Sequence, residues 1–300
     1  MNWLTRLWTP RKKPTPTATP AVPTALPIAA DDPSAAPDAR AHTLLPWLLG
    51  SASATDAPLA AMEQQALEAL DKTLALAELP DNLLPRAAAL IPQLIALVRQ
   101  TSLPTPAIAQ RVSRDAVLSA ELMRLASSSY YRAQGNVRNL EQAITLVGLQ
   151  GLQTVIARVL LKPIYGASAG PLSARIAPRM WEYSEALARH SALLAVPADQ
   201  PAFDAYLLGL LHGTGWTVAM RVLDRSGISP ALPPSTAWVQ AMEGRAHQLF
   251  GLAAQRWEIT PGFTTIARDA RQHPIAASSH ALMPVLQLAQ QRSLDEVVPP

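Results

Sequence analysis

The sequence predicts an all-α fold, and three observations support this prediction. Hydrophobic residues make up 49% of the 300-residue chain and aromatic residues only 5%, and this mixture, rich in Ala and Leu, favours packed helices over sheets. After about residue 42, apolar residues recur at spacings of three and four, as they do on the buried face of a helix. No stretch shows the polar and apolar alternation that is typical of a half-buried strand.

Residues 1–41 precede the helical pattern and are predicted to be a disordered tail. Eight prolines fall between Pro10 and Pro37, and such spacing prevents helix formation and describes an extended linker. Ordering the tail would cost about 1–2 kcal/mol of backbone entropy per residue with little apolar burial to offset it. We therefore expect the tail to be dispensable for folding.

The first residues of the tail could still form a contact. Trp3, Leu7 and Trp8 could share one face of a short helix, and a run of basic residues follows at 11–13. Interfacial tryptophans next to lysine and arginine suit anionic headgroups. A peripheral membrane contact or a partner contact through this segment is therefore one possibility, and a frayed end with two tryptophans is the other.

Residues 42–83 are predicted to be a helical lead-in, with one helix over 58–80 that ends at Pro80. In the next part, Thr105 is a candidate N-cap with Pro106 in the first turn, and Ser113 is a candidate N-cap for the following helix. Asn139 and Gln142 form a capping-box pattern. Apolar stripes are expected at Leu90, Ile91, Leu94, Ile95 and Val98 of a helix over 84–99, and at Val117, Leu118, Leu122 and Leu125. Longer helices are predicted near 151–164, 174–196, 203–224, 235–257 and 261–272, and residues 291–300 are predicted to be a C-terminal tail.

Composition excludes several classes of function. The chain has no cysteine, which removes disulfides, thiolate metal sites and cysteine nucleophiles. The net charge of +3 is too small to indicate nucleic-acid binding by itself. No run of about 18 uncharged apolar residues is present, and the N-terminus lacks the order of a signal peptide. We expect a cytoplasmic protein.

Other motifs give weaker signals. Residues 105–125 imitate a helix-turn-helix, but Asp115 and Glu121 on the second helix would repel phosphate, so nucleic-acid binding is not expected. His190, His247 and His273 fall on separate predicted helices, where a composite metal site is possible but structural roles are more common. The sequence has no G-x-S-x-G elbow and no glycine-rich phosphate loop. No catalytic residue is assigned.

An ordered set of segments carries a family resemblance. The first segment has a turn with a polar residue and Asp, then an apolar helix and a run of small polar residues with Tyr. The second segment has a capped helix that is interrupted by a glycine. The third segment contains the stretch Leu-Leu-His-Gly. They read VSRDAVLSAELMRLASSSYY (112–131), VRNLEQAITLVGLQGLQTVI (137–156) and AYLLGLLHGTGWTVAM (205–220), with MWEYSEALARHSALLA (180–195) and AHQLFGLAAQRW (246–257) in the expected places. From about Leu84 to Ala289, the chain resembles the HDOD family, the HD-related output domain of bacterial signalling proteins.

The resemblance implies an HD-like, two-lobed helical bundle over 84–290 and a lost metal site. The family descends from metal-dependent phosphohydrolases that bind metal through an early His, a His-Asp pair and a further Asp. Here the early His position falls on Tyr183, and the pair reads His212-Gly213. A hard divalent cation left with one imidazole lacks an adequate ligand set. We expect no metal and no cofactor, and a hydrogen-bonded core role for His212.

The resemblance also suggests where a ligand or partner would bind. Lobes over 84–165 and 174–290 would leave a cleft between them, with Ser127, His212, Trp216 and His247 as candidate cleft residues. Ser127 replaces an Asn of the family, and Trp216 stands where many relatives carry a basic residue. Gly213 and Gly215 are expected at a bend or a close helix contact, because glycine inside a helix costs about 1 kcal/mol relative to alanine.

These observations predict a non-catalytic signalling or regulatory module that acts through contacts with protein partners. The alternative is a residual phosphohydrolase, or a protein that binds a small molecule or a cyclic dinucleotide in the cleft through His212. A third possibility is an adaptor recruited to membranes by Trp3 and Trp8. The presence or absence of bound metal separates the first two.

Overall fold

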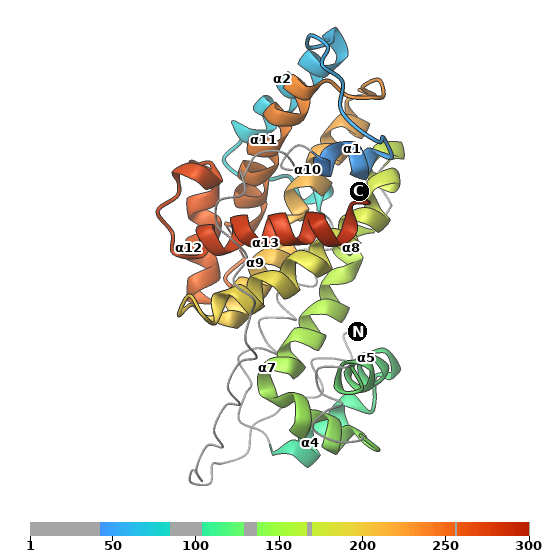
Figure 1. Cartoon of the computed structure of the whole chain (residues 1–300), viewed down its shortest axis with the longest axis vertical. Coiled ribbons are helices and arrows are strands. Elements are labelled where there is room, and N and C mark those ends of the chain that lie inside the picture. Colours follow the sequence, from blue (N-terminus) through green and yellow to red (C-terminus); the bar gives the residue numbers. More distant parts are fainter. Residues whose placement is uncertain (1–42, 85–103, 129–136, 167–169, 256, 300) are drawn as a thin grey trace. The chain divides into compact units, whose positions relative to one another are not determined.

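Helices form the regular structure of the computed structural model over the residues it describes, which are 43–84, 104–128, 137–166, 170–255 and 257–299 (Figure 1). These residues belong to one unit, 40–300. The all-α prediction is confirmed for the described residues of this unit. The predicted tail, with Trp3, Leu7 and Trp8, lies outside the described residues, as does the predicted helix over 84–99 apart from Leu84.

The helices follow the predicted order. Along the chain they are α1 (Leu44–Leu49), α2 (Ala61–Leu74), α4 (Thr105–Val112), α5 (Ala116–Ala126), α7 (Leu140–Leu161), α8 (Pro171–Ala195), α9 (Ala202–His212), α10 (Thr214–Arg225), α11 (Thr236–Ala254), α12 (Pro261–Gln272) and α13 (Leu282–Val297). Short 3₁₀ turns are η3 (Asp81–Leu83), η4 (Lys162–Tyr165) and η5 (Ile275–Ala277).

The buried apolar residues form two separate clusters, which confirms the two-lobed prediction but corrects the bound at 165, because Leu84 and α7 from Ala157 onward belong to the large core. The small core consists of buried residues of α4, α5 and α7 as far as Val155. The large core begins on α7 at Ala157 and also contains residues of α1, α2 and α8 to α13. Figure 1 shows α4 and α5 beside one end of α7. Helix α7 therefore contributes to both cores.

Helix α7 is bent and strongly apolar. Gly148 has φ 67° and ψ −175° inside the helix, a conformation that glycine adopts most readily, so the glycine joint seen in the sequence is a real bend. By length and composition alone, the segment Leu140–Tyr165 could cross a membrane, with a mean hydropathy of 1.6. Core helices can pass the same test, and α7 supplies buried residues to both clusters.

Helix ends confirm some predicted caps and correct others. The Asn139 side chain accepts a hydrogen bond from the Gln142 N–H at 2.8 Å, as predicted. The N-cap of α5 is Asp115 rather than Ser113, because the Asp115 carboxylate accepts from the N–H groups of Val117 and Leu118. Ser113 instead donates to the Gln110 carbonyl of α4. The predicted inward stripe is also wrong at Val117, which is 59% exposed.

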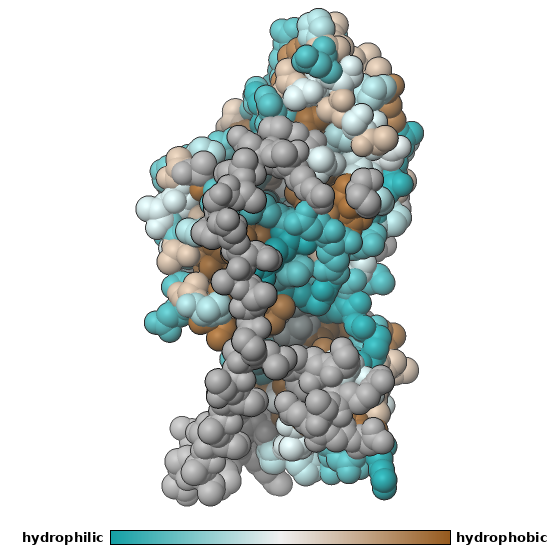
Figure 2. Space-filling model, in the orientation of Figure 1, coloured by the Kyte–Doolittle hydropathy of each residue, from teal (hydrophilic) through white to brown (hydrophobic). Residues whose placement is uncertain are grey.

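Two predicted boundaries in the large core are corrected. The helix expected over 203–224 is divided at Gly213 into α9 and α10. The tail expected over 291–300 is helical as far as Val297, since α13 continues through this region and buries Ser293 and Leu294. The outer side of α13 carries polar residues, and Figure 2 shows a largely hydrophilic surface where α13 and α8 lie in Figure 1.

The lead-in is firmly attached to the large core. The buried Glu63 carboxylate of α2 accepts hydrogen bonds from the Ala60 N–H, from the Ser235 N–H at 2.8 Å and from the Ser235 hydroxyl at 2.7 Å. The buried Arg221 guanidinium of α10 donates to the carbonyls of Leu83, Ile164 and Gly166. A buried charge needs such partners, and here they join segments distant in sequence.

The start of α8 is capped by a residue from another helix. The Asp224 carboxylate of α10 accepts from the N–H groups of Leu172 and Ser173, each at 2.9 Å, and from the Ser173 hydroxyl at 2.6 Å.

We expect Asp224→Ala to lower the free energy of unfolding by about 1–2 kcal/mol, because it removes the acceptor for N–H groups in the first turn of α8. Urea denaturation followed by circular dichroism measures this change. The exposed Asp56 provides a control: Asp56→Ala should change stability by less than about 0.5 kcal/mol, and an equal loss in both variants would contradict the capping role.

Candidate functional site

The histidine singled out by the sequence ends α9 and lies inside the large core. His212 is 3% exposed and His247, on α11, is 1% exposed. The His212 Nε2 atom lies 3.0 Å from the His247 Nδ1 atom, within hydrogen-bond distance. The Phe250 ring also packs against His212, with centroids 5.3 Å apart. The two imidazoles therefore form a buried hydrogen-bonded pair, which agrees with the core role predicted for His212.

Both imidazoles are held in the neutral form. Burial, followed by the neighbouring His247, lowers the pKa of His212 from 6.5 to about 3. Burial also lowers the pKa of His247 to about 4, with a partial opposing effect from the Asp269 carboxylate and the His273 main chain. A neutral imidazole has one N–H donor and one acceptor nitrogen. One ring therefore donates to the other, and neither ring is in the charged imidazolium form near pH 7.

The position of the early family histidine is a buried tyrosine. Tyr183 on α8 is 1% exposed, and its side chain has a hydrogen bond with Gln290 of α13. Burial, with an addition from the charge of Glu243, raises the pKa of the Tyr183 hydroxyl above its usual value. A neutral phenol held in this way is a poor metal ligand. Tyr183 therefore acts as a core residue.

The position next to His212 has no room for a carboxylate. Gly213 lies between α9 and α10, and a Cβ atom added to it would lie 2.4 Å from the Ser184 Oγ atom and 2.7 Å from the Met180 Cε atom. The methionine end could move, but Ser184 is short and buried on α8. The space that an aspartate at 213 would need is filled by side chains of α8.

The residues present do not fit the divalent metal that the fold family implies. A divalent transition metal or magnesium needs several imidazole or carboxylate ligands that converge on one point. Among the described residues, no group of three or more His, Asp or Glu side chains meets this condition. His212 and His247 come together, but Tyr183 and Gly213 supply no anionic ligand.

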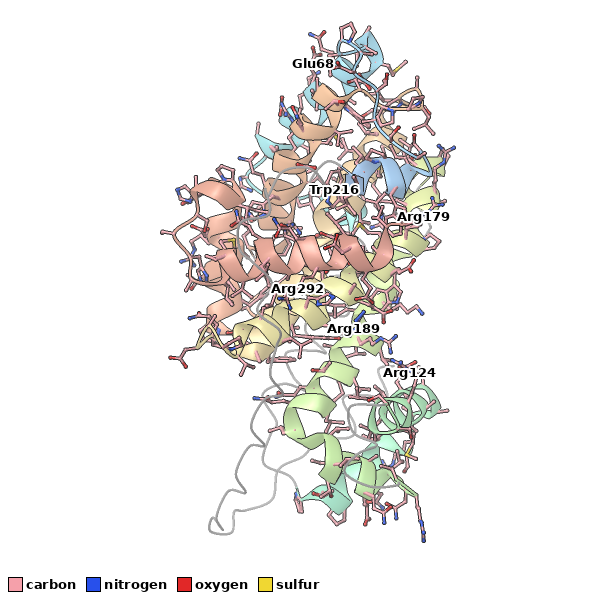
Figure 3. All side chains as sticks on the ribbon, in the orientation of Figure 1. Glu68, Arg124, Arg179, Arg189, Trp216 and Arg292 are labelled. Carbon is pink, nitrogen blue, oxygen red and sulfur yellow. The ribbon has the colours of Figure 1, made fainter. Side chains whose placement is uncertain are left out.

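The remaining predicted site residues do not line one open cleft. Trp216 is 3% exposed on α10, one turn after His212 (Figure 3). Ser127 is exposed at the C-cap of α5, on the small core. His190 pairs with Glu296 at 2.9 Å, and His273 lies 3.2 Å from Asp269. The predicted cleft group is therefore corrected: His212, His247 and Trp216 lie in the large core, while Ser127 lies apart from them.

Two features of the site could not be found from sequence patterns. His247 lies 35 residues after His212, and only the packing of α11 near the end of α9 brings the two rings together. Tyr165 donates its hydroxyl hydrogen to the Leu210 carbonyl and also lies beside Gly213. Neither relationship follows a helical spacing.

The fold and the site together define an all-helical, two-lobed, HD-like domain in which a buried central histidine, His212, is followed by a glycine. A family model for the HDOD domain matches residues 84–271. The chain belongs to the HDOD family. The matched range ends before the predicted limit of 290. No curated protein matches the sequence.

Two solved structures share this fold. An HDOD domain protein of unknown function from Geobacter sulfurreducens has a TM-score of 0.52 and 19% identity, with 78% of this chain and 80% of that chain covered. A protein from Shewanella amazonensis SB2B, provisionally named a metal-dependent phosphohydrolase, has a TM-score of 0.56 and 16% identity, with 80% of this chain and 90% of that chain covered. At these identities the likeness concerns the fold alone.

Proposed function

We propose that this chain is a non-catalytic regulatory member of the HDOD family that acts by binding protein partners. The observation that carries the proposal is the packing at Gly213, where the Ser184 hydroxyl and the Met180 side chain occupy the space of the missing carboxylate. Loss of one ligand by point mutation would leave a hole. Here the neighbouring helix fills the position, so the core is built around the altered site.

The chemistry of phosphate-ester hydrolysis supports the same proposal. Metal-assisted hydrolysis needs an ion that activates water and polarises the phosphate. The described site offers two neutral imidazoles that already bond to each other, and both are shielded from solvent. A substrate would have to open the large core to reach them. A protein partner that binds the outer surface can do so without opening the core.

The full-length chain should bind no stoichiometric Mn²⁺, Fe²⁺ or Zn²⁺. We expect less than about 0.1 metal per chain by elemental analysis after incubation with each ion and desalting, because one buried imidazole pair without carboxylates supplies too few ligands for any of these ions. Hydrolysis of p-nitrophenyl phosphate and of cyclic dinucleotides should equal that of a heat-inactivated sample. One metal per chain that disappears in His212→Gln, together with phosphatase activity, would establish the residual phosphohydrolase instead.

A paired variant separates partner binding from an imidazole-dependent ligand site. His212→Gln with His247→Asn preserves polar atoms near the present Nε2 and Nδ1 positions but removes both imidazoles. Full-length wild type and variant are each used to capture proteins from the source cell, and circular dichroism confirms that both are folded. The proposal requires the same specific partners with both proteins. If no specific protein binds the wild type, or if binding depends on the imidazoles, the proposal is contradicted.

A further inference from the structure

The boundary between the two cores passes through α7 at a defined point. Val155 belongs to the small core and Ala157 to the large core, while Ile156 packs against both. The helices that pack most closely on α4 and α5 are α7 and each other. Among the described residues, the small core is therefore a distinct packing unit that meets the large core along α7.

An arginine at this boundary binds a carboxylate from each side. Arg158 lies two residues after Ile156, and its guanidinium forms ion pairs with Glu121 of α5 and with Glu185 of α8. Its Nη1 atom donates to Glu121 and its Nε atom donates to Glu185. One side chain thus links a helix of the small core directly to a helix of the large core.

The environment makes this link stronger than an ordinary surface ion pair. The side chains of Arg158, Glu121 and Glu185 are 25%, 29% and 23% exposed. Pairs at such partly buried sites are less screened by water and salt than fully exposed ones. Burial alone would lower the pKa of Arg158, but the two glutamates outweigh burial and raise it. The charges of Arg158 and Glu185 also act, in opposite directions, on the pKa of the buried Tyr206 of α9.

A second arginine provides a contrast within the same cluster. Arg124 of α5 binds the same Glu121 oxygen at 2.9 Å, but its side chain is 61% exposed and both residues belong to one helix. Figure 3 labels Arg124 on α5 and Arg189 on α8, on either side of the boundary. The Arg124–Glu121 pair cannot connect the cores, whereas Arg158 connects them through two glutamates.

We propose that Arg158 is an electrostatic latch between the two lobes, and that breaking its pairs with Glu121 or Glu185 lets the small core open from the large core as a unit. This inference stands independently of the proposed function, because it rests on contacts between the lobes alone. The latch would make the relative mobility of the lobes sensitive to ionic strength. It would also give a partner a route to regulation, since an anionic group that binds Arg158 would compete with the two glutamates.

Hydrogen exchange measured by mass spectrometry on the full chain tests the latch. In Glu121→Gln and in Glu185→Gln, amides of α5 should exchange about tenfold faster than in wild type, while amides of α11 keep their wild-type rates, because only the link between the lobes is lost. In 1 M NaCl, where the Debye length falls to about 3 Å, the wild type should move toward the variants. The variants themselves should respond much less to salt.

Arg124→Gln is the matched control, since it removes a charge that also pairs with Glu121 but leaves both ion pairs of Arg158 in place. It should leave the exchange of α5 within about twofold of wild type. The latch is refuted if either glutamate variant leaves α5 exchange unchanged. It is equally refuted if α5 and α11 accelerate together, because that result means a general loss of stability. An effect of Arg124→Gln as large as that of Glu121→Gln would also overturn it, because the relevant contact would then lie within α5.

Discussion

Lowering the pH from above 7 to 5 is expected to reduce the free energy of unfolding by about 4 kcal/mol through the His212–His247 pair alone. In the folded chain these residues have pKa values of about 3 and about 4, against 6.5 for an ordinary histidine. At pH values between the folded and the unfolded pKa values, the unfolded chain binds up to two more protons than the folded chain. The free energy of unfolding therefore falls as the pH falls. Each depressed pKa costs about 1.4 kcal/mol per pH unit below 6.5. The stability that the neutral pair gives to the folded chain is fully present above pH 6.5 and is lost as the pH falls toward 3–4.

Urea denaturation at several pH values, followed by circular dichroism, measures this dependence. A loss of about 4 kcal/mol is a large share of the 5–15 kcal/mol that is typical of folded domains. His212→Gln with His247→Asn should lose most of the dependence between pH 7 and 5, because it keeps polar groups at the contact but removes the titration. The same slope in wild type and in the paired variant would show that other groups cause acid unfolding.

Gly215→Ala is expected to lower the free energy of unfolding by about 3 kcal/mol or more. A Cβ atom at this position would lie 1.9 Å from the Ala246 carbonyl oxygen and 2.9 Å from the Phe250 nitrogen. These are backbone atoms of α11, so no side chain can move aside, and α10 and α11 would have to separate. Overpacking of this kind costs about 1–3 kcal/mol even where side chains can adjust. Thermal and urea denaturation provide the measurement.

Gly244→Ala is the matched control, because it makes the same chemical change on α11. An added Cβ at Gly244 meets nothing within 4 Å, and the residue is exposed inside a helix. This variant should be more stable than wild type by about 0.5–1 kcal/mol, since alanine favours the helix. Opposite signs for the two glycines are the expected outcome. Destabilisation of equal size in both would contradict the close approach at Gly215.

Local patterns predicted the helices well but not all of their ends. Asn139 was recognisable as a cap because its pattern, with Gln142 three residues on, depends only on neighbouring residues. Between α4 and α5, both Ser113 and Asp115 have side chains that can cap a helix, and in the structure Asp115 caps α5. Residue spacing alone did not separate these two candidates, nor did it show that Val117 is exposed. The break at Gly213 was anticipated as a bend, but the division into two helices depends on contacts with α8.

The candidate site was only partly predictable for a similar reason. The sequence shows that Gly213 cannot provide a carboxylate, and the family resemblance placed Tyr183 at the position of a lost histidine. The sequence could not show that Ser184 and Met180 fill the space beside Gly213, because these two residues precede Gly213 by about 30 positions and lie on another helix. Nor could it pair His212 with His247. Contacts between distant helices are set by packing, which has no signature in residue spacing.

The attachment of the lead-in also bears on how this domain could be inherited or exchanged between proteins. The family match covers 84–271, but Glu63 binds Ser235, Arg221 binds the Leu83 carbonyl, and α13 completes the large core beyond the matched range. Recombination at residues 84 and 271, the limits of the family match, would remove the buried residues Leu45, Leu48, Leu70 and Leu286 from the large core. In this chain, the unit that folds around the large core is therefore longer than the range matched by the family model. A fusion partner joined to this domain is expected to be tolerated before residue 43 or after residue 297, but not at residue 84 or 271.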